Sequence, residues 1–330
     1  MKEGNRVGEP AAQTTGVLLT AVGGPASLDE VAPFLLDMRG GRPTPKSLVS
    51  EFRERYRRIG GKSPLLEISR AQAEALEVRL NEMGGRYRCY VGMRNWHPYI
   101  RETIQEMAGD NLGRIVVLPL TPYYSRRSVG TYFQAVEEGL PGFGRSIDVA
   151  YVDSWNTESM LLDAFAAKVE DGMKRLEAKG FREPVVLFTA HSLPTKLIEE
   201  GDLYERKLLE TMTLILTRLR PIQARMAWQS AGRTDEPWLG PPLEELIEAL
   251  SKAGEKSVLI MPFGFISDHL EILYDVDIEA REQAERLGIH LERAESLNTD
   301  PRFIDAMASA VRSAEGSTSR PRPGISGTTA

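Results

Sequence analysis

The chain has 330 residues, of which 42% are hydrophobic and 27% are charged, as is usual for a globular protein. Its formal net charge of -6 gives no overall basic field, so we expect no nucleic acid and no anionic lipid surface as partners. A single cysteine, Cys89, excludes an intrachain disulfide and a cysteine-ligated iron–sulfur cluster. No stretch approaches the ~20 apolar residues of a membrane span, and the first residues lack the apolar core of a secretory signal. We therefore expect a cytoplasmic protein.

Both ends of the chain lack a hydrophobic period. Residues 1–15 and 315–330 are rich in small and polar residues, which predicts a disordered N-terminal arm and a disordered tail. Between them, short runs of β-branched residues alternate with amphipathic stretches at helical spacing. This alternation is typical of a parallel sheet with crossover helices, so the predicted fold class is α/β.

The apolar runs form two series that follow the same order along the chain. Predicted strands of the first series lie within 16–25, 88–98, 114–125 and 146–156, and those of the second within 185–194, 224–238, 256–267 and 288–298. Predicted helices include 71–83, 98–109, 158–178, 203–219 and 242–254. We predict two similar Rossmann-like halves, residues 16–158 and 159–314, each a four-stranded parallel sheet flanked by helices. Ligands of such sheets bind at the carboxyl ends of the strands, so we expect a cleft between the halves.

One histidine and three acidic residues occupy positions of interest in the second half. His191 directly follows the apolar run 185–190, at the carboxyl end of a predicted strand. A strand-end histidine that only hydrogen-bonds a loop is the alternative. Glu271, Asp275 and Glu279 recur every fourth residue of a predicted helix, where like charges on one face repel each other. The spacing indicates a path for metal ions or protons, and a solvated acidic face is the alternative.

Imidazole nitrogen and carboxylate oxygen suit a divalent first-row metal such as Fe(II), and both groups transfer protons near neutral pH. His97 and His269 are weaker candidates, because their aromatic or apolar neighbours are typical of packed, hydrogen-bonded histidines.

The first half carries a cluster of arginines in an otherwise acidic protein. Its members are Arg39, Arg42, Arg53, Arg55, Arg57, Arg58, Arg126 and Arg127. Tyrosines and aliphatic residues interleave with them, so a flat apolar ligand edged with carboxylates suits this surface. For Arg53 and Arg57 a solvated helix face is the simpler interpretation. The chain has no GxGxxG, GxxxxGK[ST] or GxSxG motif at a strand end, which disfavours nucleotide binding and serine hydrolysis.

Taken together, the blocks LLTAVGGP, RYRRIGGKSPLLEISRAQA, LPLTPYYSRRSVGTYF, TAHSLP and GFISDHLEILYDVDIEA resemble those of the ferrochelatases, which insert Fe(II) into a porphyrin. The resemblance runs from Gly16 to about Ala310. It implies two Rossmann-like domains around a porphyrin cleft, porphyrin and Fe(II) as substrates, and no organic cofactor or iron–sulfur cluster. We also expect a monomer, and a haem-pathway enzyme as the partner that accepts the product.

The resemblance also assigns site residues. The catalytic histidine falls on His191 and its partner on Glu271, and both are expected metal ligands. Asp275 and Glu279 fall on an acidic ridge that binds or passes metal, on a helix with wide π-type turns. Expected porphyrin contacts are Arg55, Tyr56, Ser63, Tyr132 and Arg39. Val22 replaces a tyrosine that ligates the product iron in some members, so no tyrosinate ligand arises from that position.

The segment LLDMRGGRPTPKSL, residues 35–48, resembles the arginine-bearing arm of enzymes that use coproporphyrin III. Coproporphyrin carries four propionates, which additional arginines would bind, so we expect it as the substrate. A protoporphyrin IX ferrochelatase that forms protohaem is one alternative. A non-catalytic tetrapyrrole carrier with His191 as axial ligand is another. The sequence leaves open which of His191 and Glu271 holds the metal and which accepts protons.

Overall fold

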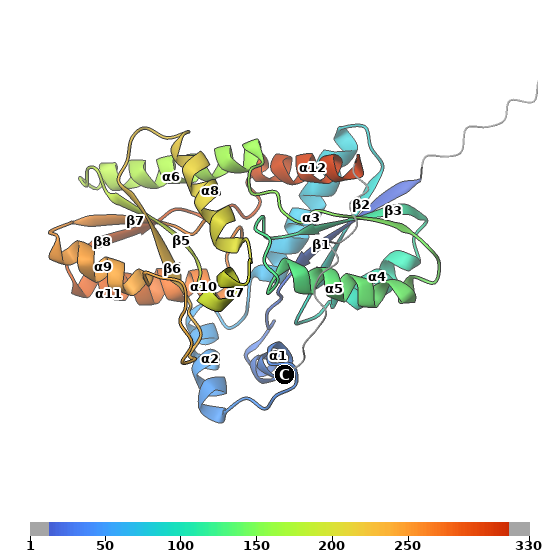
Figure 1. Ribbon diagram of the computed structural model, residues 1–330, viewed down its shortest axis with the longest axis horizontal. Coiled ribbons are helices and arrows are strands. Elements are labelled where there is room, and N and C mark those ends of the chain that lie inside the picture. The colour runs from blue at the N-terminus through green and yellow to red at the C-terminus, as the bar shows by residue number, and fades with distance from the viewer. Residues whose placement is uncertain (1–12, 317–330) are drawn as a thin grey trace, which may run out of the picture.

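The computed structural model describes residues 13–316. Within this range the strands form two parallel sheets of four strands, one from each half of the chain (Figure 1). The first sheet contains β1 (Thr14–Ala21), β2 (Tyr87–Met93), β3 (Leu112–Pro119) and β4 (Asp148–Tyr151). The second contains β5 (Val185–His191), β6 (Ala224–Gln229), β7 (Ser257–Met261) and β8 (His290–Arg293). Each predicted strand region overlaps one of these strands, and β1, β2 and β3 begin one or two residues before their predicted regions. The predicted α/β class is therefore confirmed.

The two sheets share one topology, which supports the predicted internal repeat. The strand order is β2-β1-β3-β4 in the first sheet and β6-β5-β7-β8 in the second. The first strand of each half is therefore central and is flanked by the second and third. Parallel pairing brings the ends of β5 and β6 together, with His191 opposite Gln229. This pairing places His191 at the carboxyl edge of its sheet.

Helices cover the sheets and connect their strands. Those of the first half are α1 (Val31–Met38), α2 (Lys46–Arg58), α3 (Leu65–Glu82), α4 (Ile100–Ala108) and α5 (Val129–Gly139), with short 3-10 turns η1 (Leu28–Glu30) and η2 (Leu140–Phe143). Those of the second half are α6 (Ser159–Ala178), α7 (Thr195–Glu199), α8 (Tyr204–Leu216), α9 (Leu243–Lys252), α10 (Leu270–Leu273), α11 (Arg281–Arg286) and α12 (Pro301–Glu315). The five predicted helices correspond to α3, α4, α6, α8 and α9. Among the described residues, no helix is long and apolar enough to cross a membrane.

A π-helix, η3 (Asp275–Ala280), lies between α10 and α11. The Glu279 amide donates a hydrogen bond to the Tyr274 carbonyl five residues earlier, at 2.9 Å. This bond spans one residue more than an α-helical bond and so widens the turn. The wide helical turn implied by the resemblance is thus present. It begins at Asp275, the second residue of the acidic stripe formed by Glu271, Asp275 and Glu279.

The last helix, α12, crosses back to the first half. Asp300 caps its N-terminus by accepting a hydrogen bond from the Arg302 amide at 3.0 Å. The helix packs on α3 and β3 as well as on α6, and Figure 1 shows it beside α3. Its buried Phe303 stacks on Trp155 of the first half at 5.8 Å. The predicted second half, residues 159–314, therefore includes a helix whose apolar face is buried mainly by the first half.

Both predicted disordered ends overlap ordered elements. Thr14 and Thr15 belong to β1, and Glu315 is the last residue of α12. The Glu315 carboxylate accepts hydrogen bonds from the Tyr87 hydroxyl at 2.6 Å and the Thr15 hydroxyl at 3.2 Å. The expectation of disorder is therefore wrong at these three positions, because long-range contacts hold them. Gln13 and Gly316 are also described, and the rest of the predicted N-terminal arm and tail, residues 1–12 and 317–330, lies outside the described residues.

An arm formed by α1 and α2 joins the two halves near the ends of the strands. Val31, Leu35 and Tyr56 of this arm form a buried cluster with Leu270 of α10. Figure 1 shows α2 extending from the region of α10. The arm thus brings side chains of the first half against the segment that carries Glu271.

Candidate functional site

Glu271 lies between two imidazoles. His191 ends β5, and its Nε2 is 3.7 Å from Glu271 Oε1. His269 precedes α10, and its Nε2 is 3.7 Å from Glu271 Oε2. The side chains of His191 and Glu271 are each 32% exposed, so both are accessible to a ligand. The structure thus brings together the two predicted catalytic residues and adds His269, which the sequence ranked as a weaker candidate.

Backbone carbonyls determine which nitrogen of each imidazole is available. Nδ1 of His191 is hydrogen-bonded to the Ser192 carbonyl, and Nδ1 of His269 to the Ser267 carbonyl at 3.1 Å. A carbonyl only accepts, so each Nδ1 must carry a hydrogen. In the neutral form, each Nε2 is therefore left with a lone pair beside Glu271. Such a nitrogen is able to accept a proton or bind a metal ion.

Glu271 is ionised at neutral pH. Burial acts to raise its pKa, but His191, His269 and Arg55 together outweigh burial and lower the pKa to about 2. The Gln229 amide donates to the Glu271 carbonyl at 2.8 Å, which ties the first turn of α10 to the end of β6. The site therefore presents a carboxylate beside two imidazoles, each of which is a counter-charge when protonated and a nitrogen acceptor when neutral.

Asp275 and Glu279 continue from Glu271 along η3 but are not free of counter-charge. Arg55 Nη1 lies 3.4 Å from Asp275 Oδ1, and Arg55 Nη2 lies 3.9 Å from Glu279 Oε1. The predicted like-charge repulsion is thus partly neutralised by a guanidinium from α2. Arg55, expected as a porphyrin contact, is in this structure an ion-pair partner of the acidic stripe.

The pKa of Asp275 is shifted in the direction opposite to that of Glu271. Burial and then the charge of Glu271 raise the pKa of Asp275 to about 6, although Ser230 and Arg55 act to lower it. Its side chain is 13% exposed, and the Ser230 hydroxyl donates to Oδ2 at 2.5 Å. Ser230 follows β6 with a φ of 59°, a left-handed conformation that is uncommon for serine. Asp275 is therefore a group that exchanges its proton near neutral pH.

We expect Asp275→Asn to stabilise the fold at alkaline pH. The raised pKa means that protonation of native Asp275 supports folding below about pH 4 and that this support is lost as the pH rises through about 6. The neutral amide avoids this loss, so the free energy of unfolding should rise by up to about 3 kcal/mol at pH 8 and match wild type near pH 4. Urea denaturation across this range tests it. If Asp275→Asn were less stable than wild type at pH 8, the attraction between Arg55 and Asp275 would outweigh the repulsion between Glu271 and Asp275.

Three other predicted porphyrin contacts, Tyr56, Ser63 and Tyr132, are buried. Burial raises the pKa of Tyr56 and Tyr132, and the Glu271 carboxylate raises both further, so their phenols remain protonated. The Ser63 amide donates to the Pro25 carbonyl at 2.8 Å. A Cβ added at Gly24 would lie 2.6 Å from the Ser63 side chain, so this close approach requires glycine. The loop after β1 thus packs tightly against the start of α3.

Arg39, the remaining predicted porphyrin contact, lies at the C-terminal end of α1. Its Nε is buried and has no hydrogen-bond partner within residues 13–316, and the same holds for Nε of Arg55 and Arg94. Arg94 was not predicted. It follows β2, where its amide donates to the Ala21 carbonyl at 2.8 Å, and its charge acts on Tyr132. Buried N–H groups without an acceptor are costly, so an anionic ligand at these positions would be stabilising.

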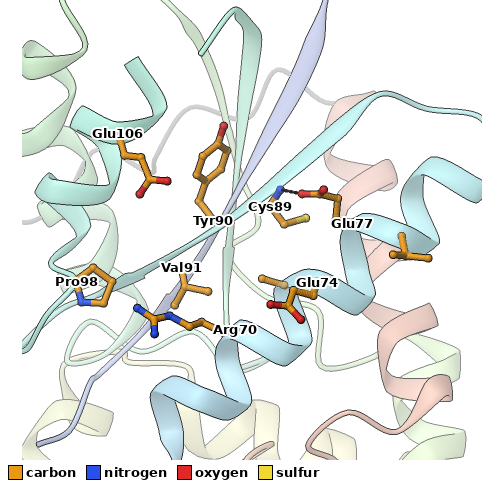
Figure 2. A pocket seen from close by; sticks show the side chains of 10 residues that line it. Arg70, Glu74, Glu77, Cys89, Tyr90, Val91, Pro98 and Glu106 are labelled. Atoms are coloured by element: carbon orange, nitrogen blue, oxygen red, sulfur yellow. Dashed lines mark hydrogen bonds between the residues drawn. The ribbon is translucent and has the colours of Figure 1, made fainter. Parts of the chain in front are cut away.

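A pocket of about 500 Å³ lies elsewhere, at the open edge of the first sheet (Figure 2). It is lined by α3, β2 and α4, including Glu74, Glu77, Cys89 and Glu106. The Cys89 amide donates to Glu77 Oε2 at 2.8 Å, and burial raises the pKa of the Cys89 thiol. None of the predicted site residues lines this pocket. Within the described part of the chain, no group of three or more His, Cys, Asp or Glu side chains is arranged to hold a metal ion.

Comparison with known proteins identifies the family. The family model described as Ferrochelatase matches residues 14–315. A ferrochelatase of Deinococcus radiodurans is 41% identical over 298 residues, covering 90% of this chain and 94% of the relative. A coproporphyrin III ferrochelatase of Geobacillus thermodenitrificans is 37% identical over 307 residues, covering 91% and 96%.

A solved structure shows a similar fold. SirB from Bacillus subtilis, determined with Fe3+, has a TM-score of 0.57 and 13% identity, and the match covers 91% of this chain and 95% of that chain. At this identity the likeness concerns the fold alone. The sequence matches carry the family assignment: the chain belongs to the ferrochelatase family, the enzymes that insert a metal ion into a porphyrin.

Proposed function

We propose that this ferrochelatase inserts Fe(II) into coproporphyrin III, without an organic cofactor or an iron–sulfur cluster. The observation that carries the choice of porphyrin is that the buried Nε atoms of Arg39, Arg55 and Arg94 have no hydrogen-bond partner among the described residues. Propionate oxygens are strong acceptors for guanidinium N–H groups. Coproporphyrin offers four propionates and protoporphyrin only two. The name of the Geobacillus thermodenitrificans relative supports the same choice.

His191 is the proposed acceptor of the pyrrole protons. Insertion of Fe(II) displaces two pyrrole protons, and a single imidazole accepts only one at a time. His191 would therefore take the first proton, pass it to solvent through its 32% exposed side chain, and then take the second. Nδ1 of His191 carries the ring hydrogen, because it is hydrogen-bonded to the Ser192 carbonyl. In the neutral imidazole, Nε2 therefore has the required lone pair. The ionised Glu271 at 3.7 Å stabilises the imidazolium that forms. Asp275 and Glu279, which follow Glu271 along the helix, lead Fe(II) toward the ring.

A side-by-side turnover assay with coproporphyrin III and protoporphyrin IX tests the substrate. We expect kcat/KM for coproporphyrin to be about tenfold higher or more, the equivalent of one additional shielded propionate contact of about 1.4 kcal/mol. Arg39→Leu should reduce this preference. Arg53→Leu should leave it unchanged, because Arg53 pairs at the surface with Asp29 at 3.8 Å.

Each outcome of the assay discriminates between hypotheses. Equal kcat/KM values for both porphyrins would overturn the coproporphyrin assignment and leave the family reaction in place. Binding of porphyrin without iron insertion would favour the carrier alternative. The monomeric state, the cytoplasmic location and a product-accepting haem-pathway partner stay predictions from the sequence.

A further inference from the structure

Arg55 lies where two sets of anions meet. Its guanidinium contacts Glu51 at 3.1 Å, Asp275 at 3.4 Å and Glu279 at 3.9 Å. The side chain is only 19% exposed and stacks on the Tyr274 ring, with 4.8 Å between Cζ and the ring centroid. One positive charge therefore faces three carboxylates, two of which lie on the expected route of iron.

We propose that Arg55 is a gate that makes access of Fe(II) to Asp275 and Glu279 depend on prior binding of porphyrin. This inference rests on the proposed function, because it requires a propionate near Arg55. Without porphyrin, the guanidinium occupies the two carboxylates that iron would use. A propionate competes for the same N–H groups and draws the guanidinium away, which leaves both carboxylates free for a divalent cation.

The contacts of Arg55 are suited to such an exchange. Its two contacts with the stripe are long, and Nε has no partner within the described residues, so a better acceptor is able to displace them. Arg55 belongs to α2 of the first half, whereas Asp275 and Glu279 belong to η3 of the second. Breaking the contact therefore disrupts no helix.

The neighbouring Glu51 does not oppose the release of Arg55 from Asp275 and Glu279. Arg233 donates two hydrogen bonds to the Glu51 carboxylate, at 2.6 and 2.8 Å. Glu51 thus keeps a positive partner when Arg55 moves. The carboxylates that lose their counter-charge are Asp275 and Glu279, so the negative potential grows where the cation is to bind.

Co²⁺ binding to the porphyrin-free protein tests the gate by calorimetry. Arg55→Met removes the charge and keeps an apolar side chain on Tyr274, so Co²⁺ should bind about tenfold more tightly or better, within the range usual for coupled sites. Arg58→Met is the matched control, because Arg58 also stacks on Tyr274, at 5.6 Å, but pairs with Glu282. The control should match wild type. Adding Asp275→Asn and Glu279→Gln to Arg55→Met should abolish the gain.

Coupling to porphyrin gives a second readout. Zinc coproporphyrin III carries the propionates, but its ring is already filled, so it reports binding without insertion. Zinc coproporphyrin III should raise the Co²⁺ affinity of wild type and leave the Co²⁺ affinity of Arg55→Met unchanged. Circular dichroism confirms folding, and Arg55→Gln is the substitute if Arg55→Met does not fold.

The gate would be overturned if, in the absence of porphyrin, wild type and the charge-free Arg55 variant bound Co²⁺ with equal affinity. Coupling that survives in that variant would also overturn it. Both readouts measure binding, so they are distinct from failure of the proposed function, which would appear as absent iron insertion by wild type.

Discussion

Replacing His191 by alanine should lower kcat for iron insertion by about 10²- to 10⁴-fold, the usual contribution of a positioned general base. The reason is that Nε2 of His191 has a lone pair beside the ionised Glu271, at 3.7 Å from its Oε1. Coproporphyrin binding should change little, because the expected propionate contacts come from other residues. The measurement is kcat by absorbance, with porphyrin affinity from fluorescence quenching.

His97→Ala is the control for the loss of an imidazole. His97 is exposed and pairs with Glu102 at 3.0 Å, on the loop after β2. It should retain wild-type turnover. Normal turnover by a folded His191→Ala protein would contradict the assignment of His191 as base and transfer that role to His269.

Replacing Glu271 by glutamine should lower kcat by about 100-fold or more, because a preorganised charge next to the reacting groups is lost. Glutamine keeps the shape of the side chain and the backbone contact with Gln229, so the change concerns charge. The pKa of Asp275 should fall, since Glu271 is one of the two groups that raise it. Steady-state kinetics and a pH profile from pH 5 to 9 measure both effects.

Glu282→Gln is the matched control for Glu271→Gln. Glu282 lies on α11, is largely exposed and pairs with Arg58. Its loss should leave kcat and the pH profile unchanged. If Glu271→Gln changes only the dependence on iron concentration and not kcat at saturation, Glu271 binds metal but does not stabilise the transition state.

Local pattern was sufficient for the strands and for part of the site. Strand regions were predictable because buried parallel strands are short, continuous apolar runs bounded by turn residues. His191 was predictable because it directly follows such a run. The stripe of Glu271, Asp275 and Glu279 was predictable because four-residue spacing brings side chains onto one helical face. Each of these inferences depends on neighbours in the sequence.

The partners of those residues were not predictable, since they come from distant parts of the chain. Arg55 and Asp275 are 220 positions apart and meet only because the α1–α2 arm packs on α10. Arg94 gave no signal because an arginine after a strand is common on protein surfaces. His269 was undervalued because its apolar neighbours are equally typical of a core histidine.

The sequence by itself determined the α/β class, the two matching sets of strands, the strand-end position of His191 and the four-residue spacing of the acidic stripe, because these depend on hydrophobic period and spacing. Only the tertiary structure decided that α12 returns to the first half and that Arg55 partly neutralises the stripe. It also decided that neighbouring carboxylates have pKa values of about 2 and about 6. The physical reason is that burial and charge pairing depend on which segments pack together, and local sequence does not encode that.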